Sequence, residues 1–210
     1  MKTLYLFVGN FSSSKSEEFF EEELPYLKKY FDRIILVPLY NNNSELRVHN
    51  DLIEILHFDA FSGFNRVKLL SGNLMLVLKI FVYEFYHTHH KWHYLINFRR
   101  LINEILFRIN AAIKFEEHIN KNENVFLYSY WFNQWAFIIS LLKLFNPKFK
   151  TFTRAHGSDY KEEQTGKVLN FRYFQLKHID KVVCVSEYAA NYLNKKFKLP
   201  INNRENAVPY

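Results

Sequence analysis

Two groups of chemically versatile side chains stand in the last third of this sequence, each directly after a short apolar run. An arginine guanidinium is a rigid fork of donors suited to phosphate or carboxylate. A histidine moves a proton near neutral pH or donates to a sugar hydroxyl, and a glycine lets the backbone approach a ligand. We therefore expect a binding or reaction site here. The first group is Arg154, His156, Gly157 and Asp159, and the second is Ser186 and Glu187.

Both groups also have a purely structural interpretation, and the spacing leaves the choice open. Arg154 and Asp159 would pair with each other in an ordinary loop. Glu187 would stand in the first turn of a helix, where an acidic side chain complements the helix dipole.

Strand and helix patterns alternate along the chain, without an internal repeat or a low-complexity linker. This alternation predicts one α/β domain over residues 1–210, with a parallel sheet covered by helices on both faces. Ligands of such sheets bind at the carboxyl ends of the strands, which is where both polar groups stand. The predicted strands are 4–8, 33–39, 52–58, 125–130, 150–154 and 181–185. The predicted helices are one that begins at Ser16, then 65–118 with a break near 87–94, 131–145, 166–178 and 187–197.

Composition narrows the classes of protein that fit. Hydrophobic residues make up 49% and aromatic residues 19%, which favours a packed globular fold over disorder. A formal charge of +7 favours anionic partners. The one cysteine, Cys184, has no partner for an internal disulfide, which suits a reducing compartment. The apolar start ends at Val8 and does not read as a signal peptide. The apolar stretch 74–86 contains Lys79 and Glu84, so no transmembrane segment is predicted.

Several motifs resemble the N-terminal domain of bacterial family 4 glycosyltransferases of the GT-B fold. One is the Arg-x-His-Gly-x-Asp stretch at 154–159, and another is the strand and helix start at 179–188, followed by Asn-Tyr-Leu at 191–193. The acidic and aromatic run at 16–24 and the segment 128–132 also fit. The resemblance covers both ends and the later half of the chain, whereas residues 45–120 match no pattern of the family.

The resemblance implies a Rossmann-like domain with an added helical section at about 65–120, forming one half of a GT-B architecture. His156 would lie in the cleft near the transferred sugar, as the catalytic residue. Trp131 and Asn133, with Gln134 and Trp135, would line the acceptor site, although core packing also explains the two tryptophans. The other substrate-binding residues would be Arg154, Gly157, Asp159, Ser186 and Glu187, with Lys15 and Ser16 binding an anion at a helix N-terminus.

The implied activity is transfer of a sugar from a nucleotide-sugar to a polysaccharide or lipid-linked acceptor in the cytoplasm, with retention of anomeric configuration. No metal or cofactor is implied, because the nucleotide-sugar is a substrate. In this family a second, C-terminal domain with a pair of glutamates binds the donor, and we expect it to be absent from this chain and the chain alone to be inactive. The alternative is a non-catalytic module that binds an acceptor or a membrane and works with a separate donor-binding chain.

Two further clusters lie in the middle of the chain. His89 and His93 would share a helix face with metal-ligand spacing, but a solvated, basic helix end fits them better. Basic residues interleave with apolar ones between 66 and 114, which fits helices resting on an anionic membrane surface and equally fits amphipathic packing with a basic outer face. They form no compact stripe, so we expect no nucleic-acid partner. The basic residues are Arg66, Lys68, Lys79, Lys91, Arg99, Arg100, Arg108 and Lys114.

Overall fold

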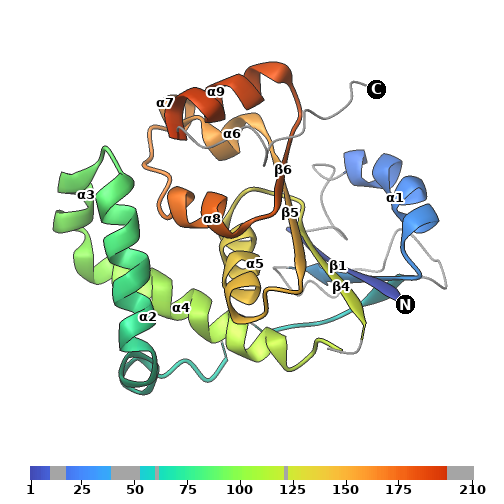
Figure 1. The fold of residues 1–210 in the computed structure, drawn as a ribbon, viewed down its shortest axis with the longest axis horizontal. Helices are drawn as coiled ribbons and strands as arrows, with labels where there is room; N and C mark the ends of the chain where they lie inside the picture. The colour runs from blue at the N-terminus through green and yellow to red at the C-terminus, as the bar shows by residue number, and fades with distance from the viewer. Residues whose placement is uncertain (10–17, 39–52, 60–61, 121–122, 198–210) are drawn as a thin grey trace.

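The computed structural model describes residues 1–9, 18–38, 53–59, 62–120 and 123–197 (Figure 1). Strands and helices alternate along these residues, as the sequence predicts. The strands are β1 (Lys2–Val8), β2 (Arg33–Pro38), β3 (Ile53–Ile55), β4 (Asn124–Ser129), β5 (Lys150–Ala155) and β6 (Lys181–Cys184). The helices are α1 (Glu18–Tyr30), α2 (Arg66–His87), α3 (Lys91–Ile96), α4 (Phe98–Glu116), α5 (Gln134–Phe145), α6 (Gly157–Tyr160), α7 (Glu162–Thr165), α8 (Arg172–His178) and α9 (Glu187–Phe197).

The six strands form one all-parallel sheet in the order β3-β2-β1-β4-β5-β6. Strand β1 lies in the middle, with Tyr5 opposite Ile35 of β2 and Leu127 of β4. The fold is therefore α/β and Rossmann-like, which confirms the predicted fold class. In this strand order the chain runs outward from β1 in one direction and then from β4 in the other. A gap between crossover connections, called the topological switch point, therefore lies at the carboxyl ends of β1 and β4.

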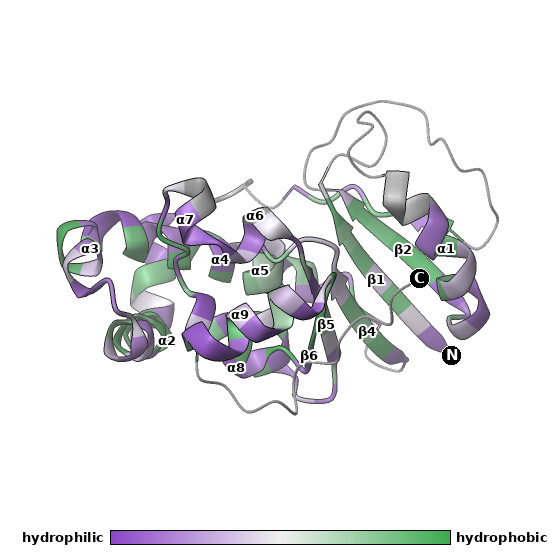
Figure 2. Cartoon of the chain, turned by 90° about the horizontal axis from the view of Figure 1, so that it is seen from above, coloured by the Kyte–Doolittle hydropathy of each residue, from purple (hydrophilic) through white to green (hydrophobic). Residues whose placement is uncertain are grey.

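Alternate residues of the strands face two separate hydrophobic clusters. On one face Tyr5, Phe7 and Leu127 pack against α4, α5 and α8 in the larger cluster. On the other face Leu4 and Leu6 pack in a smaller cluster with side chains from α1. Figure 2 shows α1 on one side of the sheet and the remaining helices gathered on the opposite side and beyond β6. The central strands are buried on both faces, which explains why they are continuously apolar.

The helical section between β3 and β4 is broken where the sequence predicts. Helix α2 starts at the N-cap Asn65, whose side chain accepts a hydrogen bond from the backbone N–H of Lys68, and it ends at Thr88. The short α3 follows, and α4 begins directly after Asn97. Helix α4 lies directly on the sheet, where Phe115 contacts Tyr5 and Phe7 of β1, and it packs beside α5. Helix α2 packs on α4 and α8.

Two predicted helices begin later than expected. The helix predicted at 131–145 starts at Gln134, because Asn133 accepts a hydrogen bond from the backbone N–H of Trp135 and acts as its cap. The helix predicted at 166–178 is wrong over its first part. Gly166 has a φ of 62° and ends α7, and Phe171 has a φ of 61°, so α8 starts only at Arg172. Left-handed backbone at either position interrupts a helix.

Among the described residues, α2 is long and apolar enough to cross a membrane by length and composition, with few of its residues buried. The sequence reasoning predicts no such segment, since Lys79 and Glu84 interrupt the apolar stretch. In the structure one face of α2 is packed inside the protein through Val77, Ile80 and Phe81, together with Glu84. Core helices of soluble proteins can be equally long and apolar, so length and composition alone do not decide the role of α2.

Candidate functional site at the switch point of the sheet

The carboxyl ends of β1 and β4 lie side by side at the switch point. The backbone N–H of Tyr130 donates to the carbonyl oxygen of Phe7 at 3.0 Å, which extends the pairing beyond the last residue of β4. After β1 the chain continues into residues 10–17, and Lys15 and Ser16 of the predicted site lie outside the described residues. The candidate site therefore consists of residues from the loops after β4 and β5.

The rings of His156 and Trp131 lie against each other at this edge. Their centroids are 4.4 Å apart with an interplanar angle of 41°, and the ring of Tyr130 lies 5.7 Å from that of His156. The carbonyl of Trp131 accepts a hydrogen bond from the hydroxyl of Ser129 at 2.6 Å and one from the hydroxyl of Thr153 at 3.4 Å. Side chains at the ends of β4 and β5 thus hold the backbone that presents the indole.

Asp159 fixes the loop that carries His156. Its Oδ2 accepts hydrogen bonds from the backbone N–H of His156 at 3.2 Å and from that of Phe132 at 3.3 Å. The same oxygen lies 3.5 Å from Nδ1 of His156, but that buried nitrogen makes no hydrogen bond to any residue that the structure describes. Asp159 therefore joins the loops after β4 and β5 through backbone contacts and holds the imidazole only weakly.

The buried guanidinium of Arg172 contacts the same loop. Arg172 donates from Nη2 to the carbonyl oxygen of Asp159 at 2.7 Å, and its guanidinium carbon lies 3.6 Å from the centroid of Phe132. Burial lowers the pKa of Arg172 to about 10, against the opposing attraction of Asp159. It therefore stays charged near neutral pH and contributes a fixed positive charge beneath the site.

Arg154 is paired with a residue that the sequence reasoning missed. Its Nη1 lies 2.9 Å from Oε2 of Glu23 on α1 and 3.3 Å from the hydroxyl of Tyr130. The hydroxyl of Tyr128 also donates to Glu23, at 3.0 Å. Burial raises the pKa of Tyr128 well above its usual value, so this phenol stays protonated. The alternative in which Arg154 pairs with Asp159 is wrong. Nothing in the run of glutamates at 21–23 singles out Glu23.

The second predicted group, Ser186 and Glu187, has a structural role in the described contacts. The hydroxyl of Ser186 accepts a hydrogen bond from the backbone N–H of Ala189 at 3.2 Å and so caps α9. Glu187 is exposed in the first turn of α9. Gly157 opens α6, next to His156. Among the contacts of the described residues, none joins the side chain of Ser186 or Glu187 to His156.

The two tryptophans have different environments. Trp135 is 1% exposed and packs against Phe7 at a centroid distance of 5.0 Å, so it belongs to the core. Trp131 is partly exposed at the sheet edge. The side-chain oxygen Oδ1 of Asn133 is used in the helix cap, and the backbone carbonyl oxygen of Asn133 accepts a hydrogen bond from the side-chain amide of Gln175 at 3.2 Å. Of the predicted acceptor residues, Trp131 is therefore the one positioned beside His156.

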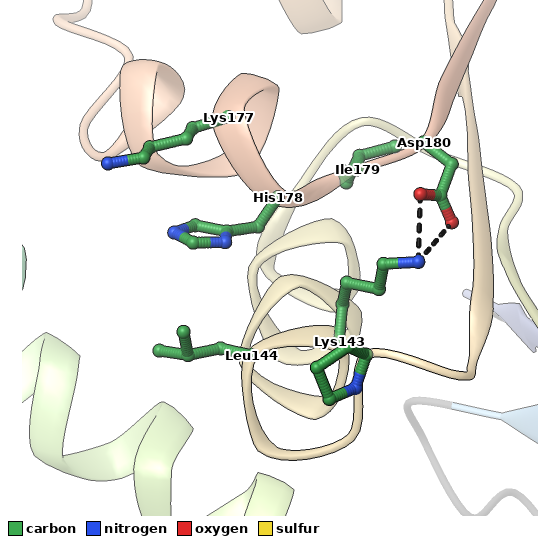
Figure 3. A pocket seen from close by; sticks show the side chains of 7 residues that line it. Lys143, Leu144, Lys177, His178, Ile179 and Asp180 are labelled. Carbon is green, nitrogen blue, oxygen red and sulfur yellow. Dashed lines mark hydrogen bonds and ion pairs between the residues drawn. The ribbon is translucent and has the colours of Figure 1, made fainter.

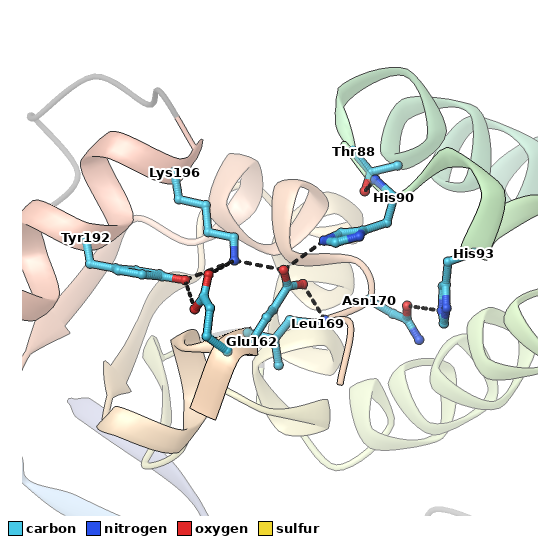
Figure 4. Close-up of polar contacts among 9 residues, drawn as sticks. Thr88, His90, His93, Glu162, Leu169, Asn170, Tyr192 and Lys196 are labelled. Atoms are coloured by element: carbon cyan, nitrogen blue, oxygen red, sulfur yellow. Dashed lines mark hydrogen bonds and ion pairs between the residues drawn. The ribbon is translucent and has the colours of Figure 1, made fainter. Parts of the chain in front are cut away.

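His90 and His93 each contact a polar side chain from a distant part of the chain. His90 lies 2.9 Å from Glu162, which also accepts hydrogen bonds from Lys196 and from the backbone of Leu169 (Figure 4). His93 contacts Asn170 at 3.1 Å. Burial opposes ionisation of Glu162, but these donors outweigh it and the pKa of this carboxyl is lowered. These contacts tie α3 to α7 and α9, and the described residues contain no group of three or more potential ligands for a metal ion.

A separate cavity of about 290 Å³ lies at the opposite, amino edge of β5 and β6 (Figure 3). Lys143 lines it and pairs with Asp180 at 2.8 Å. His178 also lines it, and burial together with the charge of Lys177 lowers the pKa of this imidazole to about 4. Because ligands of parallel sheets bind at the carboxyl edge, the site around His156 is a better candidate for the functional site than this cavity.

Comparison with known proteins finds no family model that matches the chain and no curated protein that matches it. The candidate site therefore rests on geometry and on the sequence motifs. It consists of an imidazole tilted against an indole, two tyrosines and an ion pair, at the carboxyl ends of β4 and β5 beside the switch point. Such an arrangement suits a ligand with an apolar face and hydroxyl groups, because the indole can pack on that face while the imidazole meets a hydroxyl. The hydroxyls of Tyr128 and Tyr130 contact the ion pair and so belong to the framework of the site.

Proposed function

We propose that this chain is the acceptor-side domain of a glycosyltransferase that moves a sugar from a nucleotide-sugar to a polysaccharide or lipid-linked acceptor. In this proposal a donor-binding domain, in the same or a separate polypeptide, supplies the nucleotide-sugar. The proposed location is the cytoplasm, with which the single, buried thiol of Cys184 is compatible.

The observation that carries the proposal is the contact between His156 and Trp131 at the switch point of the sheet. The Arg-x-His-Gly-x-Asp motif supplies the histidine at the end of β5, and the strand that resembles the same family supplies the indole after β4. A sugar ring can stack on the indole while its hydroxyl meets the imidazole. Because Nδ1 of His156 is buried, Nε2 is the ring nitrogen that such a hydroxyl can reach.

The ion pair between Arg154 and Glu23 affects which kind of ligand the site can bind. The arginine charge is balanced by a carboxylate, so the site does not present a bare cation beside the imidazole. That favours a neutral sugar over a phosphate at this position. The anionic part of a donor would then be bound by the other domain, as the family resemblance implies.

The test is a titration of the ¹⁵N-labelled chain with two probes, followed by the side-chain signals of Trp131 and His156. The first probe is octyl β-glucoside below its micelle-forming concentration, which mimics a sugar carried on a lipid. The second is UDP-glucose. We expect the glucoside, with an affinity on the order of millimolar, to shift both signals. We expect UDP-glucose to shift them much less.

Two variants and one control decide whether the binding is at this site. Trp131→Ala and His156→Ala should each weaken glucoside binding by about tenfold, whereas Tyr188→Ala, at an exposed tyrosine of α9, should leave it unchanged. If neither octyl glucoside nor a set of related octyl glycosides shifts the two signals, the acceptor-side function is wrong. Sugar transfer by the chain alone, at rates well above background, would contradict the need for a donor-binding domain.

A further inference from the structure

Helix α2 carries two apolar faces, although a surface helix of a soluble domain needs only one. The inner face packs on α4 and α8 through Val77, Ile80 and Phe81. The outer face is exposed, with Val82 at 61% of its surface and Tyr86 at 74%. The outer face, which follows a kink of α2 at Asn73, consists of Leu74, Met75, Leu78, Val82 and Tyr86.

The exposed apolar surface continues beyond α2. Trp92 and Ile96 of α3 are 77% and 80% exposed, and Leu95 is also exposed. Helices α2 and α3 lie together at the end of the molecule farthest from α1 (Figure 2). A shallow groove along α2 is lined by Met75, Val82 and Tyr86 and others of the outer face. Single exposed apolar residues are ordinary, but several that line one groove, as Met75, Leu78, Val82 and Tyr86 do on α2, mark a surface that binds a partner.

The charge of this region indicates the chemistry of its partner. Between residues 62 and 103 the sequence contains six lysines and arginines and one acidic residue, Glu84. Glu84 is buried on the inner face of α2, and the next acidic residue, Glu104, lies 3.9 Å from Arg100, so the exposed charge of this region is predominantly positive. The six basic residues, all exposed, are Arg66, Lys68, Lys79, Lys91, Arg99 and Arg100.

We propose that the outer face of α2 and α3 docks on the surface of an anionic lipid bilayer. Apolar side chains would enter the boundary between headgroups and acyl chains, and the surrounding lysines and arginines would meet lipid phosphates. This inference does not depend on sugar transfer, because it rests on exposed side chains and charge alone.

The helix lies on the bilayer and does not cross it. Its inner face is fixed to α8 by Glu84, which accepts a hydrogen bond from the backbone N–H of Phe174, and by contact with α4. To span a membrane, α2 would have to leave these partners and carry Glu84 and Lys79 into hydrocarbon. A helix with one face in protein and the other apolar and rimmed by cations has the features of an interfacial helix.

The test is flotation of the whole chain with vesicles of phosphatidylcholine and with vesicles of equal parts phosphatidylcholine and phosphatidylglycerol. We expect binding to the anionic vesicles that weakens as salt is raised, and much weaker binding to the neutral ones. Val82→Ser/Tyr86→Ser should weaken binding at least about tenfold. Lys79→Glu/Arg99→Glu should do the same.

Matched controls come from α1, at the opposite end of the molecule. Tyr26→Ser/Tyr30→Ser removes two equally exposed aromatic residues, and Lys28→Glu/Lys29→Glu reverses two charges of α1. Both control variants should bind vesicles like the parent chain. The four substituted positions are exposed, so these variants should fold like the parent chain, which circular dichroism verifies. A loss of vesicle binding then reports on the surface itself. The positions are Lys79, Val82, Tyr86 and Arg99.

Trp92 reports the docking directly. Its fluorescence should shift to shorter wavelength with anionic vesicles, and Trp92→Phe should abolish the shift while most of the binding persists. The proposal is overturned if anionic vesicles do not bind the chain, or if the α1 controls reduce binding as much as the α2 variants. It is equally overturned if the outer face proves to hold two copies of the chain together, so that Val82→Ser/Tyr86→Ser abolishes a dimer in sedimentation and vesicles bind neither form.

Discussion

Nη1 of Arg154 lies 2.9 Å from Oε2 of Glu23, so an ion pair joins the end of β5 to α1 across the edge of the sheet. Both side chains are about one sixth exposed, and two tyrosine hydroxyls also form hydrogen bonds with them. Because the pair is largely withdrawn from water, each charge depends on the other. The arginine that the sequence offers as a ligand-binding group is thereby part of the framework of the site.

Glu23→Gln should therefore destabilise the fold by about 2 kcal/mol, since it removes the carboxylate charge beside the guanidinium of Arg154. The measurement is urea unfolding followed by circular dichroism. The double variant Glu23→Gln/Arg154→Met should lose less stability than the sum of the two single variants, because the guanidinium that Glu23 stabilises is also gone.

The control for this pair is Arg33 and Glu54, which join β2 to β3 at the surface, with side chains 34% and 51% exposed. Glu54→Gln should cost at most about 1 kcal/mol, because solvent screens an exposed pair. If Glu23→Gln and Glu54→Gln lower the free energy of unfolding by equally small amounts, the pair of Arg154 and Glu23 contributes no more stability than an exposed ion pair.

The sequence predicted the strands and the polar edge because both depend on local pattern. Continuous apolar runs such as 34–37 indicated strands buried on both faces, and His156 was identified because polar residues directly follow a strand. Which strands are neighbours is not a local property. The pairing of β1 with β4, which creates the switch point beside Trp131, comes from packing across more than a hundred residues.

The partners of the candidate residues could not be predicted for a related reason. Glu23 is one of several acidic residues at 17–23, and only the orientation of α1 on the sheet selects it for Arg154. Ser186 follows a strand, which predicts a ligand-binding residue. The same position precedes a helix, where its hydroxyl accepts a hydrogen bond from the backbone as the N-cap. The helix predicted from Gly166 starts only at Arg172, because the left-handed backbone at Phe171, which is not a glycine, leaves no signal in the sequence pattern.

The buried carboxyl of Glu84 should lower the stability of the fold as pH rises. Burial raises the pKa of this carboxyl from 4.5 to about 8, although the backbone N–H of Phe174 and the hydroxyl of Tyr94 donate to it. Between these two values the unfolded chain releases the proton and the folded chain keeps it. The contribution of Glu84 is therefore fully present below about pH 4.5 and is lost as pH rises to about 8. The loss is at most about 5 kcal/mol.

Glu84→Gln removes this titration and keeps both contacts, since the amide oxygen accepts from Phe174 and the amide N–H donates to the phenol. We expect the variant to gain stability relative to the parent chain as pH increases, in urea unfolding at a series of pH values. Glu84→Leu should instead cost about 1–3 kcal/mol at all pH values, because it leaves the buried N–H of Phe174 without an acceptor. A parent chain whose stability relative to Glu84→Gln does not change with pH would contradict the raised pKa.

The imidazole of His178 should have the opposite effect at lower pH, where the stability of the fold should decrease as pH falls. Burial, with the charge of Lys177, lowers the pKa of this imidazole from 6.5 to about 4. Between these values the unfolded chain takes up a proton and the folded chain does not. The stability contribution is therefore complete above about pH 6.5 and is lost as pH falls toward about 4. The loss is about 2 kcal/mol after allowance for solvent at the edge of the cavity.

His178→Gln should remove this slope, whereas His89→Gln, at an exposed histidine before α3, should preserve it. Unfolding of the three proteins in urea at several pH values between about 4 and about 7 provides the comparison. If His178→Gln and the parent chain lose stability in parallel as the pH falls, the imidazole is not buried in its neutral form.

The two tryptophans next to the site should separate stability from binding. Trp135→Ala should cost about 3–5 kcal/mol, because a fully buried indole leaves a cavity against Phe7 in the core. Trp131→Ala should cost only about 1–2 kcal/mol, since this ring is partly exposed and rests on His156. Trp131→Phe keeps an aromatic face and should retain most of the affinity for octyl glucoside that Trp131→Ala loses. Urea unfolding measures the first difference and the glucoside titration the second. An equal loss of affinity in the Phe and Ala variants would show that stacking on this ring does not hold the sugar.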